Sequence, residues 1–485
     1  MSAGDVVVGV DIGTTSTKVL VVGTDGTEVA GHRVATSWTG RAGWSETSAD
    51  SFVAAALRAV DGALTAAARV LGRTPQVAGL GVCGMGESGV LLGPDGSVRA
   101  PVVAWFDPRG GDALAALPVP VRDAFAATTG LPLTPLCTLA KLLWLREQGV
   151  RLDRGACWLN VPEYVAHRLG AERAGEPSLA SRTGLLDQST GAPWRAALDA
   201  LGVGDDLLPP LRAAGTGLGH ARGVDLPRGL AGATVVVAGH DHPVASFGAG
   251  AWGPDDLFDS LGTAESVLRV VSRPLTGEQR QALVAAGLTV GAHVLEDCSV
   301  VAGPTRGGIV LRRVLGLLGA TDGGARDALD AAWGPDRPEA GVSVSGARMT
   351  DDDVVVRVVG EEVTPSDVWA EALRHVSATI SCLVASIDEQ VGPRRAVVAA
   401  GGWTRMASVR GQKLRTLPDV TFSPRRQAGA FGAATLAAWA AAGRHGTAVG
   451  FAAGFVPDGG APATGPTATP RALRHHPVAT RGAFA

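Results

Sequence analysis

Apolar residues recur along this chain with two different periods. Residues 6–10 and 17–22 are continuous apolar runs separated by a short polar turn, which predicts two strands of a hairpin. Asp25 and Gly26 predict a second tight turn directly afterwards. Between residues 50 and 71 the apolar positions recur at helical spacing instead, which predicts one amphipathic helix.

Strand and helix patterns alternate along the rest of the chain. Further strands are predicted at residues 77–83, 90–92, 102–105, 234–238, from 257 onward and at 396–400. Further helices are predicted after Thr364, reaching about residue 391, and at 429–442. This alternation indicates an α/β protein. The composition turns to Pro, Gly, Ala and Thr near the end, so residues 456–485 are expected to form a poorly ordered tail.

The length and composition limit the classes of protein to consider. A chain of 485 residues exceeds one ordinary core, so we expect two domains, at residues 1–250 and 251–455, with a cleft between them. No continuous apolar run approaches the roughly 18 residues of a membrane span, and a net charge of −3 without a basic run predicts no nucleic-acid surface. With no visible secretory signal and five scattered cysteines, a cytoplasmic protein is expected.

The first predicted hairpin carries the sequence DIGTTSTK at residues 11–18. Gly13 lets the backbone turn tightly and approach a ligand, and the exposed amides and hydroxyls there suit a phosphate group. The carboxylate of Asp11 would repel phosphate unless a cation lay between them. Asp11 is therefore expected to hold Mg²⁺, directly or through water.

The plan of this hairpin is repeated in the second half of the chain. Residues 257–271 form an apolar strand, the turn SLGTAES and another apolar strand, so that Gly262 and Thr263 correspond to the first Gly-Thr turn. Such a repeat predicts paired domains that hold one phosphate chain from opposite sides. Gly401 and Gly402 end another buried strand, and bare backbone at that point suits a nucleotide base or ribose.

Several segments, taken in their order along the chain, resemble those of the FGGY carbohydrate kinases, which belong to the actin-like ATPase superfamily. These segments are VGVDIGTTSTKVLVV, GLGVCGMGESGVLLGPDG, VVAWFDPRG, TLAKLLWL, VVVAGHDHPVASFGAG, DSLGTAES, AAGGW and QAGAFGAA. The resemblance covers most of the chain. It implies two actin-like, ribonuclease H-like domains and an ATP-dependent kinase that phosphorylates a hydroxyl of a small sugar or polyol.

The resemblance also assigns roles to individual residues. Asp241 follows an apolar strand and precedes small residues, where the family places the general base that takes the proton of the substrate hydroxyl. The residues expected to bind ATP are Gly13, Thr14, Thr15, Lys18, Gly262, Thr263, Gly401 and Gly402. The residues expected to bind the sugar, with Asp241, are Glu87, Trp105, Asp107 and Arg109, which offer carboxylates, a cation and an apolar ring.

The sugar-binding loop departs from two known patterns of the family. Xylulose kinases usually carry GQMH there, whereas residues 84–87 of this chain are GMGE. Glycerol kinases place Glu where Glu87 stands, but they place Arg where Gly86 stands. The substrate is therefore left open between ketoses and polyols. Trp403 either stacks on the base or packs in the core, and Gln427 replaces an acidic residue of the family pattern.

Two other functions compete with the kinase interpretation. GxGxxG occurs at residues 79–84 and 248–253, as in dehydrogenases, but the first copy precedes a strand rather than a helix, and 67 glycines make the pattern common. A non-catalytic ATP-binding switch or sugar sensor would use the same phosphate hairpins. Such a protein would not need Asp241 with the polar loops around Glu87 and Asp107. The sequence leaves a homodimer open.

Overall fold

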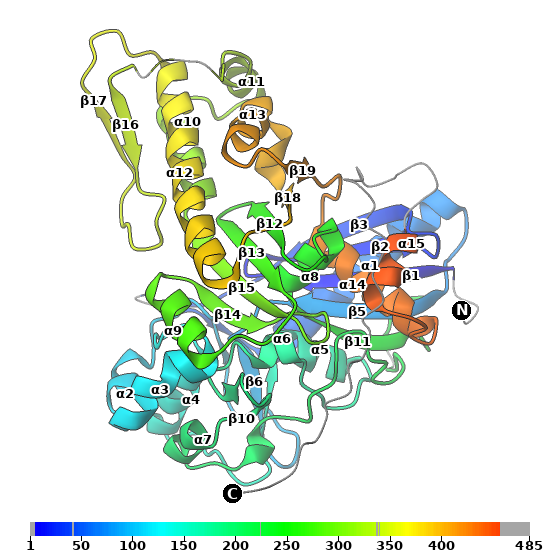
Figure 1. The fold of residues 1–485 in the computed structure, drawn as a ribbon. Helices are drawn as coiled ribbons and strands as arrows, with labels where there is room; N and C mark the ends of the chain where they lie inside the picture. Colours follow the sequence, from blue (N-terminus) through cyan, green and yellow to red (C-terminus); the bar gives the residue numbers. More distant parts are fainter. Residues whose placement is uncertain (1–4, 41–42, 224, 336–337, 339, 456–485) are drawn as a thin grey trace, which may run out of the picture.

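Two mixed β-sheets organise the computed structural model, which describes residues 5–40, 43–223, 225–335, 338 and 340–455 (Figure 1). The first sheet has the order β11-β5-β1-β2-β3, with β1 (Val6–Ile12), β2 (Ser16–Gly23), β3 (Glu28–Ala35), β5 (Val77–Gly84) and β11 (Thr234–His240). The second has the order β14-β15-β13-β12-β18-β19, with β12 (Asp256–Leu261), β13 (Glu265–Val271), β14 (Thr289–Ala292), β15 (Ser299–Thr305), β18 (Ala396–Ala400) and β19 (Val420–Phe422).

Both sheets follow one plan. In each, a central strand, β1 or β12, pairs antiparallel with the strand that follows it and parallel with a later strand, β5 or β18. The α/β class is therefore confirmed, and the repeat of the two hairpins in the sequence corresponds to a repeat of the sheet topology. The predicted tail, residues 456–485, lies outside the described residues.

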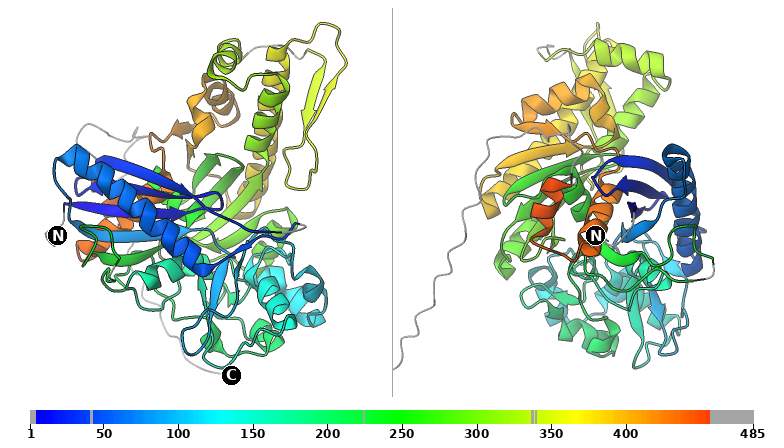
Figure 2. Two further views of the ribbon diagram at one scale, coloured as in Figure 1. Left: turned by 180° about the vertical axis from the view of Figure 1, so that it is seen from behind. Right: turned by 90° about the vertical axis from the view of Figure 1, so that its right-hand side faces the viewer.

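Helices cover the outer face of each sheet. α1 (Ala49–Leu71) packs on the first sheet with α5 (Val161–Arg168), as Figure 2 shows from behind, and α12 (Pro365–Val391) packs on the second. By length and composition α1 could cross a membrane. Its apolar side chains, Phe52 and Val60 among them, are instead buried against the first sheet.

Two helices cross between the sheets. α8 (Asp241–Ala249) follows β11 of the first sheet, but its Ala245 and Ala249 pack against the second sheet. α14 (Ala428–Ala441) follows the second sheet, but it covers the inner face of the first. The helices touch closely, since a Cβ added at Gly248 would lie 2.0 Å from the carbonyl oxygen of Ala428.

The glycine-rich segment 79–84 has a structural explanation. It lies within β5, where a Cβ at Gly79 would come 2.6 Å from the oxygen of Ala437, and one at Gly81 would come 2.0 Å from that of Ala433. The missing side chains thus let α14 approach the sheet. The dinucleotide-binding interpretation is unnecessary, because the next element is the strand β6.

Insertions enlarge both halves. The insertion between β5 and β11 has a core of its own and consists of β6 (Gly89–Leu92), β7 (Val102–Val103), α2 (Gly111–Ala115), α3 (Val119–Thr129), α4 (Thr138–Glu147), β8 (Cys157–Asn160), α5, α6 (Pro177–Ala180), β9 (Leu186–Asp187), β10 (Ala192–Pro193), α7 (Arg195–Leu201) and a 3₁₀ turn (Asp205–Leu207). The remaining elements are β4 (Glu46–Thr47), α9 (Gly277–Ala285), α10 (Gly307–Leu317), α11 (Gly323–Ala331), β16 (Val342–Ser345), β17 (Val355–Val358), a 3₁₀ turn (Gly402–Arg405), α13 (Ala407–Thr416) and α15 (Ala448–Gly454).

Candidate active site

Three parallel strands of the first sheet end at one edge. β1 and β11 flank β5 and run parallel to it, and both Asp11 and Gly239 pair with Cys83 of β5. Asp241 comes two residues after Gly239, and the loop with Glu87 follows β5. Two strand spacings, about 10 Å, separate the ends of β1 and β11. The topology therefore brings Asp11, Glu87 and Asp241 to the same edge of the sheet.

Asp241 is the first residue of α8, and its side chain is 28% exposed. Its Oδ1 accepts a hydrogen bond from the backbone nitrogen of His242 at 2.8 Å and lies 3.2 Å from Nε2 of His240. Burial opposes ionisation, but His242 and His240 outweigh it and hold the pKa of Asp241 below its usual value. The helix N-terminus also favours a negative charge. Asp241 is thus an ionised carboxylate at neutral pH.

Asp11 is the residue before the last one of β1, and a single lysine, Lys18, contacts its carboxylate in the described part of the chain. Its Oδ2 lies 3.1 Å from Nζ of Lys18, and α14 begins beside it, since a Cβ at Gly429 would lie 3.2 Å from the same oxygen. Burial raises the pKa of Asp11, Lys18 only partly offsets this effect, and Asp241 adds to it. Lys18 pairs with Asp11 in this structure, so its ammonium group lies at the base of the first hairpin beside this carboxylate.

Hydrogen bonds from neighbouring side chains position the turn of the first hairpin. The carbonyl oxygen of Gly13 accepts a hydrogen bond from Thr36, and that of Thr14 accepts one from Nε1 of Trp38. The Thr15 side chain is exposed. These bonds fix the backbone of the turn and leave Thr15 at its exposed tip.

The corresponding residues of the second sheet lie together at the ends of two parallel strands. Gly262 and Thr263 follow β12, and Gly401 follows β18, with which β12 pairs. Gly401 has φ +119°, and a Cβ there would lie 2.0 Å from the oxygen of Leu261. Nε1 of Trp403 donates to the oxygen of Gly262 at 3.0 Å. Trp403 therefore connects the glycine turn, which consists of Gly401 and Gly402, to the second hairpin.

A buried ion cluster underlies this second hairpin. Nζ of Lys413 contacts Oε1 of Glu265 at 2.6 Å and also Oδ2 of Asp259, and both carboxylates are fully buried. Burial raises the pKa of Glu265 to about 7, although Lys413 opposes the shift. The cluster joins β12, β13 and α13 beneath Gly262 and Thr263.

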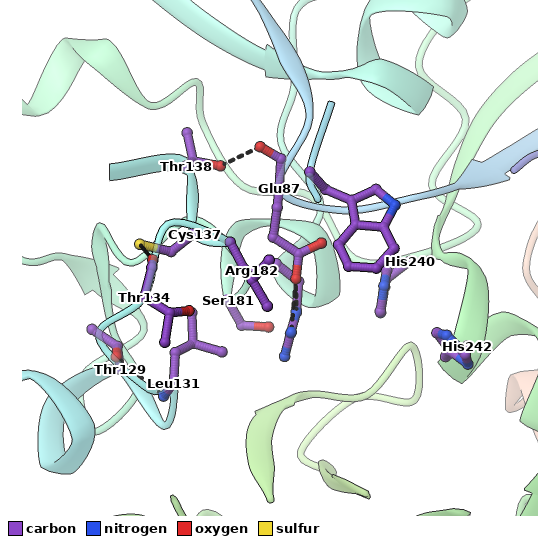
Figure 3. Close-up of polar contacts among 12 residues, drawn as sticks. Glu87, Thr129, Leu131, Thr134, Cys137, Thr138, Ser181, Arg182, His240 and His242 are labelled. Carbon is purple, nitrogen blue, oxygen red and sulfur yellow. Dashed lines mark hydrogen bonds and ion pairs between the residues drawn. The ribbon is translucent and has the colours of Figure 1, made fainter. Parts of the chain in front are cut away.

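Glu87 lies 8% exposed in the loop after β5 and has φ +63°, in the left-handed region that few non-glycine residues adopt. Its carbonyl oxygen accepts a hydrogen bond from Thr138, and its Oε1 lies 2.7 Å from both Nε and Nη2 of Arg182. Figure 3 shows this carboxylate and the guanidinium directed at each other, with the rings of His240 and His242 on one side.

Asp107 and Arg109, also expected to bind the sugar, bind each other. Oδ1 of Asp107 accepts from N and Nε of Arg109, and Oδ2 accepts from Nη2 of Arg109 and from the nitrogen of Ser45. Nη1 of Arg109 donates to Glu46, and its guanidinium lies 4.9 Å and 4.6 Å from the ring centroids of Trp44 and Trp144. These contacts occupy both side chains, and they fix the loop that carries Trp105.

Trp105 joins this loop to the first hairpin, because its Nε1 donates to Oγ1 of Thr14 at 2.8 Å. Lys141, 1% exposed, donates from Nζ to the carbonyl oxygens of Trp105, Pro135 and Leu136. Burial lowers the pKa of Lys141 to about 8.

The sequence interpretation missed Arg182, Lys141 and Lys413, although two signals pointed to them. Lys18, Lys141 and Lys413 are the three lysines of the chain, in which 40 of the 43 basic residues are Arg. Each lysine lies in the framework of the site. The second signal was Gly86. The resemblance to glycerol kinases implies an Arg at this position, and a guanidinium missing there can come from another part of the chain.

Comparison with known proteins gives consistent matches. The model of the "FGGY family of carbohydrate kinases, N-terminal domain" matches residues 6–248. L-fuculokinase of Salmonella typhi is 31% identical over 199 residues, which are 40% of this chain and 41% of that protein. Autoinducer-2 kinase of Escherichia coli strain K12 is 29% identical over 239 residues, which are 47% and 44%. The matches thus span less than half the length of these curated relatives.

Solved structures match over almost the whole chain. A xylulose kinase from Rhodospirillum rubrum has a TM-score of 0.76 at 24% identity, covering 93% of this chain and 92% of that one. Plasmodium falciparum glycerol kinase with ADP has a TM-score of 0.77 at 14% identity, covering 93% and 92%. These similarities show the fold, and the expected pair of actin-like domains is confirmed.

Proposed function

Because the chain belongs to the FGGY family of carbohydrate kinases, we propose that it transfers the γ-phosphoryl group of ATP to a hydroxyl of a small ketose or polyol. The observation that carries this proposal is the meeting of Asp11, Glu87 and Asp241 at one edge of the first sheet. One carboxylate suits a cation, one suits sugar hydroxyls and one suits proton removal.

Asp241 acts as the general base. The substrate hydroxyl gives its proton to the carboxylate as its oxygen bonds to the γ-phosphorus, and the bond from that phosphorus to the bridging oxygen breaks to release ADP. A base that is ionised at neutral pH suits this role, and the low pKa of Asp241 supports it. His240 is less suited, because burial lowers its pKa to about 4 and it lies against the carboxylate.

Asp11 fits a Mg²⁺ site by its chemistry. Mg²⁺ is usually held by one or two carboxylates together with water and substrate phosphates. The buried, only partly compensated carboxylate of Asp11 is such a ligand. When bound, Mg²⁺ neutralises phosphate charge during transfer.

ATP is bound between the repeated hairpins. Gly13, Thr14 and Thr15, with Lys18 at the base of the first hairpin, face the phosphates from one side. Gly262 and Thr263 face them from the other, and Gly401 and Gly402 line the adenosine. Residues 1–250 and 251–455 act as two domains that close around both substrates and exclude water. The crossed helices α8 and α14 connect them.

A non-catalytic ATP-binding switch or sugar sensor fits less well. The ionised carboxylate of Asp241 beside the paired side chains of Glu87 and Arg182 has no use in a pure switch.

An ADP-release assay tests the function directly. Purified protein with ATP and Mg²⁺ is offered pentuloses, hexuloses, tetritols and glycerol one at a time, and sugar-dependent ADP release is expected with at least one of them. A matched reaction without sugar measures ATP hydrolysis by water. ADP release that no member of the panel stimulates would contradict the kinase function.

A further inference from the structure

The loop that carries Glu87 has a glycine, Gly86, at a position where a side chain would not fit. Gly86 packs against Arg182, so that a Cβ at position 86 would lie 2.9 Å from Cγ and 3.1 Å from Cβ of Arg182. Any larger residue at position 86 would displace Arg182. The glycine therefore makes room for a guanidinium that comes from a segment almost a hundred residues away.

The ion pair of Glu87 and Arg182 leaves one acceptor and one donor of the two side chains for a ligand. Nε and Nη2 of Arg182 both point to Oε1 of Glu87. Within the described part of the chain, Oε2 of Glu87 and Nη1 of Arg182 have no hydrogen-bond partner. The side chains are 11% and 19% exposed, respectively. An acceptor beside a donor is the arrangement that two neighbouring hydroxyls of a sugar require.

Arg182 is held in a fixed position relative to the proposed base. It follows α6, and Oγ of Ser178 in that helix accepts a hydrogen bond from the backbone nitrogen of His240 at 2.9 Å. The same hydroxyl donates to Oε2 of Glu176, whose own nitrogen donates to Glu163 of α5. These buried bonds tie the segment that carries Arg182 to the residue that precedes Asp241.

The charges of the pocket favour a neutral substrate. Glu87 and Arg182 neutralise each other, and Asp241 at the same edge of the sheet is ionised. Burial lowers the pKa of His240 to about 4, so this ring carries no charge near neutrality. A substrate carboxylate would therefore enter a site with no uncompensated cation among these residues, next to a negative charge.

We infer that Arg182 is a specificity-determining residue of the sugar site, and that its pairing with Glu87 selects a neutral sugar or polyol with neighbouring hydroxyls over a sugar acid. This inference rests on the proposed kinase function and deepens it. Gly86 and Arg182 act together, because the glycine gives the guanidinium access to Glu87.

The test compares neutral ketoses and polyols with aldonic acids of equal carbon number in the ADP-release assay. In Arg182→Met, KM for the best neutral substrate is expected to rise about tenfold or more, as for lost hydrogen bonds to charged groups. Its kcat should change less, and KM for ATP should stay within about twofold. Arg195→Met, which removes an exposed arginine of α7, is the matched control and should behave as wild type.

Glu87→Gln provides the opposite test. This variant keeps Arg182 but removes its compensating charge, so the ratio of kcat/KM for aldonic acids to that for neutral substrates should rise. The double variant Glu87→Gln/Arg182→Met should lose that gain. The double variant also leaves no unpaired charge. If Arg182→Met does not fold in a thermal-shift assay, the KM test therefore compares the double variant with Glu87→Gln, from which it differs only at Arg182.

The outcomes separate this inference from the proposed function. An unchanged sugar KM in the folded variants that lack Arg182, or a wild-type preference for an aldonic acid, would overturn the inference while the kinase function stood. A wild-type protein that phosphorylates no neutral or acidic member of the panel would overturn both.

Discussion

Nε1 of Trp105 donates a hydrogen bond to Oγ1 of Thr14 at 2.8 Å. Trp105 belongs to the loop expected to cover the sugar, and Thr14 belongs to the hairpin expected to hold phosphate. This hydrogen bond thus connects the proposed sugar-binding loop to the proposed phosphate-binding hairpin. Arg109 binds Asp107 of the same loop, and Lys141 donates to the carbonyl oxygen of Trp105, so these contacts restrict the motion of the loop that carries the indole.

Trp105→Phe should therefore impair both substrates. Phe keeps an apolar ring but cannot donate to Thr14, so we expect kcat/KM to fall about tenfold for the sugar and KM for ATP to rise as well. Steady-state kinetics with each substrate varied would measure this. Trp194→Phe, in the core of the insertion, is the control and should retain activity. A change confined to the sugar KM would argue against coupling through Thr14.

Asp241→Asn should abolish most turnover while ATP still binds. Asn preserves the shape and can accept the hydroxyl hydrogen bond, but it cannot take a proton at neutral pH, and loss of a general base typically costs about 10²–10⁴-fold in rate. Single-turnover kinetics would measure the rate, and calorimetry would measure ATP binding. His242→Ala should keep most of the turnover. Near-normal kcat in Asp241→Asn would remove this residue from the proton transfer.

Gly401→Ala should weaken ATP binding and lower the thermal midpoint. The backbone there has φ +119°, and the new Cβ would lie 2.0 Å from the oxygen of Leu261, so the glycine turn must separate from the second hairpin. Thermal-shift measurements with and without ATP would show both effects. Gly316→Ala, in α10, should not lower the midpoint, because nothing lies within 4 Å of a Cβ added at this position. Wild-type behaviour of Gly401→Ala would contradict the assignment of this turn.

Stability should fall as the pH rises from about 5 to about 8. Burial raises the pKa of Glu163 to about 7 and that of Glu176 to about 8, from 4.5 for the ordinary side chain. The folded state thus holds protons that the unfolded state releases in this window. Above both raised values these carboxylates are ionised in the folded state too, and the stabilisation by the bound protons is lost.

Glu176→Gln, which stays neutral at every pH, should make the thermal midpoint less dependent on pH between those limits. Melting curves at several pH values would measure the difference from wild type. Glu172→Gln, at an exposed carboxylate, is the control and should follow the wild-type curve. Parallel curves for Glu176→Gln and wild type would refute the raised pKa.

The sequence predicted elements well where one pattern dominated. The helix expected at residues 50–71 is Ala49–Leu71, because an amphipathic face marked it. The helix expected from Thr364 to 391 is Pro365–Val391, because Thr364 suits the cap and Pro365 the first position. The strand expected at 102–105 is shorter, Val102–Val103, because the chain then turns to place Trp105 toward Thr14.

The site was predicted less completely, because pairing between distant residues is not visible in a linear pattern. Asp107 and Arg109 were expected to offer a carboxylate and a cation to the sugar, and in the structure their side chains bind each other. Arg182 was missed because 95 residues separate it from Glu87. The assigned roles of Asp241, Asp11 and the hairpin residues remain predictions that the variants above would test.

The position of α14 has a consequence for folding during synthesis on the ribosome. Its residues, 428–441, cover the inner face of the first sheet, whose strands β1 and β2 are synthesised long before α14. That face, with Val7 and Leu20, stays uncovered until α14 has left the exit tunnel. Until then the nascent first sheet presents an apolar surface, which makes it a natural client for chaperones that bind growing chains.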